Sequence, residues 1–134
     1  RVLVLDCEGP ISRNDNAFEL TRHFLPEAGP RLVIPGTGAA LRLPQQGEVL
    51  IGRADPGVAP QPDVDLGPHG GGQAGVSRRH ARLLYRPESW MLEDLNSTNG
   101  TFLNSVPVQP GQPVQIRTGD ILRCSQVTLI FYEE

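Results

Sequence analysis

Residues 93–104 read EDLNSTNGTFLN, and this stretch is the most informative about the fold. It continues an alternating run over residues 90–95, in which Trp90, Leu92 and Asp94 share one face of a predicted strand. The dipeptide Asn99-Gly100 is a strong tight-turn signal, because both residue types tolerate a positive φ. Residues 101–103 resume as a short strand, so the stretch predicts β-structure interrupted by a polar turn.

Turn-forming residues occur through most of the chain, which contains fifteen glycines and thirteen prolines among 134 residues. Short apolar runs between such residues favour strands over helices. The pattern predicts a β-sandwich or barrel with eleven strands, at residues 31–34, 39–43, 49–53, 64–66, 80–86, 90–95, 101–103, 106–108, 114–116, 121–123 and 127–132. Residues 54–75 are otherwise predicted to be a long loop, which is usually a functional feature in a compact domain.

Residues 1–30 differ from the rest and are predicted to be an N-terminal extension or linker, with the domain proper at residues 31–134. Residues 14–16, Asn-Asp-Asn, are typical of a helix N-cap, and apolar residues follow at near-helical spacing up to Leu25. Pro26 and Gly29-Pro30 end this one predicted helix. Because the chain begins at Arg1, it could be a fragment of a longer protein.

Composition narrows the class of function. Twelve basic against fifteen acidic residues give a net charge of −3, which argues against a nucleic-acid partner. No apolar run is long enough to cross a membrane.

Cys7 and Cys124 lack a disulfide pattern and are predicted to be free thiols in a reducing compartment, so we expect a cytoplasmic protein. The three histidines have no recognised metal-ligand spacing, and no cofactor is expected.

Two short segments carry side chains suited to an anion. Arg53 follows Gly52 at the end of a predicted strand, and its planar guanidinium matches phosphate oxygens in a bidentate manner. Ser77 and Arg78 offer a hydroxyl and a second cation where a glycine-rich loop enters a strand. Taken singly, each is more often an ordinary surface or turn residue. Ser77 and His80 also form a weak nucleophile–base pattern, but no acidic partner is marked.

Four fragments in order are far more specific, and they resemble the signature of the forkhead-associated (FHA) family. They are Gly52-Arg53, the Ser77-x-x-His80 spacing, the turn at residues 97–101 (Ser-Thr-Asn-Gly-Thr) and Gly119-Asp120. The resemblance implies an all-β, eleven-stranded FHA-like sandwich that binds phosphothreonine peptides in signalling and is not an enzyme. It assigns phosphate contacts to Arg53, Ser77 and Arg78, contacts to the phosphate region and peptide backbone to Thr98 and Asn99, and structural support to Gly52, His80 and Gly100.

Two alternatives stay open at this stage. An FHA-like scaffold could bind a partner without phosphate, or serve a purely structural role. The apolar strand before Asp6 resembles the first motif of haloacid-dehalogenase-type phosphatases, although Glu8 replaces the second aspartate of that motif. About thirty residues are too few to hold that fold, so a catalytic function for Asp6 is disfavoured.

Overall fold

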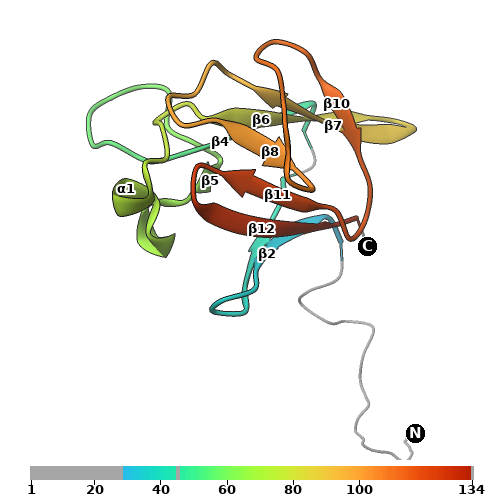
Figure 1. The fold of residues 1–134 in the computed structure, drawn as a ribbon, viewed down its shortest axis with the longest axis horizontal. Coiled ribbons are helices and arrows are strands. Elements are labelled where there is room, and N and C mark those ends of the chain that lie inside the picture. Colours follow the sequence, from blue (N-terminus) through green and yellow to red (C-terminus); the bar gives the residue numbers. More distant parts are fainter. Residues whose placement is uncertain (1–28, 45, 134) are drawn as a thin grey trace, which may run out of the picture.

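The computed structural model describes residues 29–44 and 46–133. The predicted helix near residues 14–25, the thiol Cys7 and the Asp6 motif therefore lie outside the described residues. Figure 1 shows the described part of the chain as two layers of strands that pack face to face.

Within residues 29–44 and 46–133, eleven strands form the two layers, and this confirms the predicted β-sandwich. The five-stranded sheet has the order β10-β7-β6-β4-β5, and the six-stranded sheet has the order β3-β2-β12-β11-β8-β9. All pairings are antiparallel except β4 with β5 and the isolated bridge between Asp94 and Pro110. The strands are β2 (Arg31–Ile34), β3 (Ala39–Arg42), β4 (Glu48–Gly52), β5 (Val64–Asp65), β6 (Ala81–Arg86), β7 (Ser89–Asp94), β8 (Thr101–Leu103), β9 (Val106–Pro107), β10 (Val114–Ile116), β11 (Ile121–Cys124) and β12 (Val127–Tyr132).

Alternating side chains from both sheets fill the core, as the period of two along each strand requires. Strand β12 alternates strictly between buried and partly exposed residues. Trp90 on β7 packs edge-on against Phe131 on β12, with 5.7 Å between the ring centroids, so it joins the two layers. Cys124 on β11 is a buried free cysteine that belongs to the hydrophobic core. Burial raises the pKa of its thiol to about 12, which keeps it protonated.

The segment at residues 54–75 differs from the predicted loop, because it folds into a 3-10 turn, η1 (Gly67–His69), and a short helix, α1 (Gly71–Ala74). Leu66 has no solvent exposure, and its carbonyl accepts hydrogen bonds from the amides of His69 and Gly71. One buried leucine therefore anchors the turn to the core, a tertiary effect that the polar, glycine-rich sequence does not reveal.

A second difference concerns the turn at Asn99-Gly100. Strands β7 and β8 belong to different sheets, so residues 95–100 form a connection between the layers and not a tight hairpin. Gly100 has a positive φ of 92°, whereas the other left-handed residue in this connection is Asn96, at 60°. Polar contacts from Asp94, described below, shape this longer loop.

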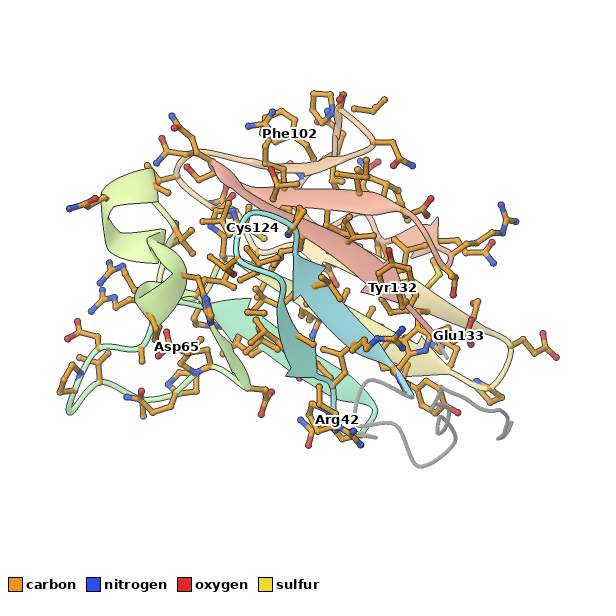
Figure 2. The ribbon with its side chains drawn as sticks, turned by 90° about the horizontal axis from the view of Figure 1, so that it is seen from below. Arg42, Asp65, Phe102, Cys124, Tyr132 and Glu133 are labelled. Carbon is orange, nitrogen blue, oxygen red and sulfur yellow. The ribbon has the colours of Figure 1, made fainter. Side chains whose placement is uncertain are left out.

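Three loops meet at one end of the sandwich. Strands β4 and β7 end there, and β6 and β8 begin there, so residues 53–63, 66–80 and 95–100 are neighbours. Figure 1 shows this end with α1, while the C-terminus lies toward the opposite end. Asp65, next to α1 in Figure 2, ties two of these loops together because its Oδ1 accepts from the amides of Ala54 (3.0 Å) and Gly67 (2.9 Å).

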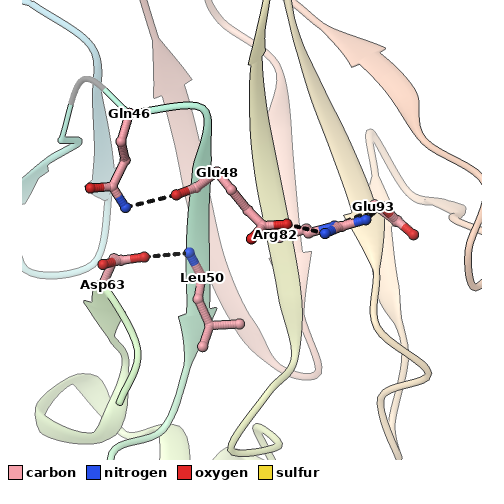
Figure 3. A network of polar contacts seen from close by, with 6 residues as sticks. All are labelled: Gln46, Glu48, Leu50, Asp63, Arg82 and Glu93. Carbon is pink, nitrogen blue, oxygen red and sulfur yellow. Dashed lines mark hydrogen bonds and ion pairs between the residues drawn. The ribbon is translucent and has the colours of Figure 1, made fainter. Parts of the chain in front are cut away.

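The end of the first loop is also fixed to β4. Oδ2 of Asp63 accepts a hydrogen bond from the Leu50 amide at 2.8 Å (Figure 3). Across β4, β6 and β7, Arg82 pairs with Glu48 on one side and with Glu93 on the other, at 2.7 Å from Glu93. These contacts hold β4, β6 and β7 in register behind the loops.

Candidate functional site

An open pocket of about 480 Å³ lies where the three loops meet. Arg53, Ser77, Arg78 and Thr98 all line it, so the structure brings together four of the five side chains that the sequence assigned to a phosphopeptide. The full lining is Arg53, Asp55, Val58, Ala59, Pro60, Ser77, Arg78, Arg79, Asn96 and Thr98.

Arg53 is held so that one edge of its guanidinium stays available. Its Nε donates to the Val76 carbonyl at 3.1 Å, and its backbone amide donates to the Ser77 carbonyl at 3.2 Å. Within the described residues, its two terminal amino groups have no hydrogen-bond partner. Two parallel N–H donors therefore remain for an oxyanion in the pocket, the arrangement that suits a phosphate.

Gly52 allows the two halves of the pocket to approach. A Cβ built at Gly52 would lie 1.9 Å from the Arg78 carbonyl oxygen and 3.1 Å from that of Ser77. Any side chain at this position would push the Ser77–Arg78 backbone away from Arg53. The prediction that Gly52 serves close backbone packing thus has a specific neighbour in the structure.

The hydroxyl group of Ser77 can donate a hydrogen bond to a ligand. Its Oγ accepts a hydrogen bond from the Thr98 amide at 3.1 Å, which joins the second loop to the third. Because that bond uses a lone pair of the oxygen, the O–H remains a donor for a ligand. Thr98 is itself exposed at the rim of the pocket.

His80 lies beneath the pocket with no solvent exposure. Its Nδ1 accepts from the Ser77 amide at 3.0 Å, so its Nε2 carries the proton and donates to the Gly100 carbonyl at 2.8 Å. Burial lowers the pKa of His80, against the raising effects of the Gly100 carbonyl and the Asp94 charge. A neutral imidazole therefore links the loop of Ser77 to the loop of Gly100.

Asp94 organises the third loop, a role that the sequence reasoning did not assign. This carboxylate is 2% exposed. It accepts from the Ser97 amide at 3.2 Å, the Ser97 hydroxyl at 2.6 Å and the Thr101 hydroxyl at 2.6 Å. Ser97 in turn accepts from the Gly100 amide at 3.0 Å. The sequence did hold a signal for this role, because Asp94 shares the inward face of the strand with Trp90 and Leu92, and a buried carboxylate needs hydrogen-bond donors.

Asn99 does not line the pocket. Its Nδ2 donates to the Gly75 carbonyl at 2.9 Å, next to the end of α1, and the residue is exposed. It therefore lies beside the pocket, at the boundary between the second and third loops. That place suits contact with the ligand backbone better than contact with the phosphate itself.

The charge in the pocket is mostly positive. Arg53, Arg78 and Arg79 line it together with one acid, Asp55, whose Oδ2 lies 3.2 Å from Nη1 of Arg78. Sequence reasoning missed Asp55 and Asn96, because residues in irregular loops show no periodicity that would place them.

No three His, Cys, Asp or Glu side chains within residues 29–44 and 46–133 gather closely enough to hold a metal ion. None of the helices in that same part has the length and apolar character that a membrane crossing requires.

Comparison with known proteins identifies the family of the chain. The family model for the FHA domain matches residues 49–125. The chain belongs to the FHA domain family. The FHA domain-containing protein FhaB of Mycobacterium tuberculosis is 43% identical over 86 residues, which cover 60% of this chain and 48% of FhaB. FhaA of the same organism is 35% identical over 95 residues, 71% of this chain and 15% of FhaA.

A solved structure, from a study of phosphothreonine-dependent FHA domain interactions, matches the FHA fold seen here. It superimposes with a TM-score of 0.62 at 31% identity and covers 78% of this chain and 96% of the other. The chain spans less than half the length of its curated relatives FhaA and FhaB. Those relatives therefore contain further sequence beyond the shared domain.

Proposed function

We propose that this FHA domain binds a phosphothreonine in a partner protein and thereby mediates phosphorylation-dependent protein–protein interaction in signalling. The observation that carries the proposal is the convergence of Arg53 and Ser77 on one pocket, with unused N–H and O–H donors. The related domain studied for phosphothreonine-dependent interactions supports the same ligand class.

In this proposal Arg53 and Ser77 hold the phosphate, Arg78 adds a second cation, and Thr98 and Asn99 hold the neighbouring phosphate region and peptide backbone. Charge-assisted hydrogen bonds contribute about 1.5–3 kcal/mol each when shielded from water. An extended peptide adds little buried area, so we expect micromolar affinity, about −8 kcal/mol. A contact to the threonine methyl group should favour phosphothreonine over phosphoserine by about 1 kcal/mol.

The role we propose is binding and not catalysis. His80 accepts from the backbone amide of Ser77, not from its hydroxyl, so it is not placed as a base that would activate Ser77 as a nucleophile. The partner protein is proposed to be a phosphothreonine-containing protein, with no role for nucleic acid or membrane. A cytoplasmic location fits the free thiol of Cys124.

We further propose that the domain covers residues 31–134. The family match begins at residue 49 and ends at residue 125. Strands β2, β3 and β12 lie outside that range and supply half of the six-stranded sheet. Leu32 and Phe131 on those strands have no solvent exposure, so a shorter fragment would expose the core.

The test is a calorimetric titration with three peptides of one sequence that carry threonine, phosphothreonine or phosphoserine. We expect micromolar affinity for the phosphothreonine peptide, weaker binding of phosphoserine and no measurable binding of threonine. Equal affinity for the phosphorylated and unphosphorylated threonine peptides would support the alternative, a phosphate-independent scaffold, and would end this proposal.

A further inference from the structure

Asp55 is an unexpected member of a site for an anion. Among the described residues that line the pocket, it is the one acid beside Arg53, Arg78 and Arg79. It forms an ion pair with Arg78 at 3.2 Å, with 38% of the Asp55 side chain and 54% of the Arg78 side chain exposed. The cation that would meet a phosphate is therefore already paired in the unliganded domain.

The backbone around Asp55 holds it in this position. The Asp55 carbonyl accepts from the Val58 amide at 3.0 Å and from Nε2 of Gln61 at 2.9 Å, which closes the loop into a compact turn. Two further hydrogen bonds hold this loop: the Ala54 amide donates to Asp65, and the Leu50 amide donates to Asp63. The carboxylate is thus presented to the pocket by a folded loop.

Arg78 is fixed from its own side. Its carbonyl packs directly on Gly52, where no Cβ could fit, and the preceding Ser77 is bonded to both His80 and Thr98. Because both backbones are held, the pair between Asp55 and Arg78 follows from the way the two loops are built.

We propose that Asp55 is an internal competitor for Arg78, which a phosphothreonine must displace in order to bind. This inference rests on the proposed function and adds a residue that sets the affinity of the same site. A dianionic phosphate takes Arg78 from a singly charged carboxylate, so exchange is favourable, but the carboxylate stays nearby as a like charge. Asp55 therefore weakens phosphopeptide binding and keeps it readily reversible.

The experiment compares Asp55→Asn with the wild-type domain in titrations with the phosphothreonine peptide used above. An exposed ion pair and a nearby like charge are each modest, so the dissociation constant should fall about threefold to tenfold. Asp55→Ala should give a gain of similar size, since it also removes the charge. Glu88→Gln is the matched control, because it removes the same charge from the exposed β6–β7 turn at the opposite end of the domain.

A double-mutant cycle then separates competition from a general effect of net charge. In an Arg78→Ala background, the gain from Asp55→Asn should shrink to less than half of its wild-type value on a free-energy scale. The same gain with and without Arg78, or an equal gain from Glu88→Gln, overturns the proposal. Unchanged or weaker binding of Asp55→Asn also overturns it, since Asp55 would then position Arg78 for the ligand.

Different results would rule out the proposed function and the role of Asp55. Should the wild-type domain not prefer the phosphothreonine peptide over the threonine peptide, the proposed function itself is wrong. Where that preference holds and only the response to Asp55→Asn is absent, the proposed function stands and the internal competitor does not.

Discussion

Replacement of His80 by asparagine should both weaken the domain and change how its stability depends on pH. His80 has no solvent exposure and connects the Ser77 amide to the Gly100 carbonyl. Asparagine can still accept from the Ser77 amide, but it is too short to donate to Gly100. The Gly100 carbonyl keeps its bond from the Ser125 amide (3.0 Å) but loses the one from His80, and the smaller side chain leaves space in the core. We therefore expect a loss of about 1–2 kcal/mol at neutral pH.

The pH dependence follows from the direction of the His80 pKa. Burial lowers this pKa in the folded domain below the value of 6.5 for a free histidine, so the unfolded chain binds the proton first. The stabilising contribution of neutral His80 is present above pH 6.5 and is lost as the pH falls toward the folded-state pKa. In that window the free energy of unfolding should rise with pH, because the unfolded chain binds more protons than the folded domain.

Urea unfolding followed by fluorescence gives the measurement. Trp90 is the single tryptophan of the chain and is 1% exposed, so its emission reports the core. Unfolding free energies of wild-type and His80→Asn are compared from pH 7.5 down to about pH 5, the window that covers histidine titration. Other groups contribute equally to both proteins, so the difference between the two curves should narrow as the pH falls. A difference that stays constant over this window would refute a buried neutral His80.

Three further predictions concern the loops. Arg53→Ala should abolish measurable binding of the phosphothreonine peptide, while the thermal midpoint of unfolding stays nearly unchanged. Arg53→Lys should recover only part of the affinity. Retained binding in Arg53→Ala would contradict the role of Arg53 in holding the phosphate. Gly75→Ala should displace Asn99, because the new Cβ would lie 2.4 Å from Nδ2 of Asn99 and Gly75 has a φ of +82°. Peptide binding should therefore weaken, while the chemical-shift changes that inorganic phosphate induces at Arg53 should stay the same. An unaltered peptide affinity would show that Asn99 does not contact the ligand. Asp94→Ala should lower the free energy of unfolding by about 2–4 kcal/mol, measured in urea, since one buried and two partly buried donors lose their acceptor. A loss below about 0.5 kcal/mol would show that the loop holds without it.

The strands were predictable because glycine, proline and other turn-forming residues bound each short apolar run. The short apolar run at residues 127–132, for example, predicts a strand where the structure has β12 (Val127–Tyr132). The fold of residues 66–75 was not predictable in the same way. It depends on Leu66, whose burial between the sheets is a contact with residues far away in the sequence.

The site shows the same division. The order of the four motif fragments indicated Arg53, Ser77, Arg78 and Thr98, and these four residues do line one pocket. Neither spacing nor composition indicated that Asp55 would pair with Arg78, because twenty-three positions separate them and the intervening loops are irregular. The roles of these residues toward a ligand stay predictions that the binding experiments test.

The most direct test of the central claim is a crystal structure of the domain with a bound phosphothreonine peptide. We predict that the phosphate occupies the pocket between residues 53–60 and 77–79, with its oxygens accepting from the terminal amino groups of Arg53 and from the Ser77 hydroxyl at about 2.7–3.0 Å. A phosphate bound anywhere else on the domain, with Arg53 still facing solvent, would contradict the account.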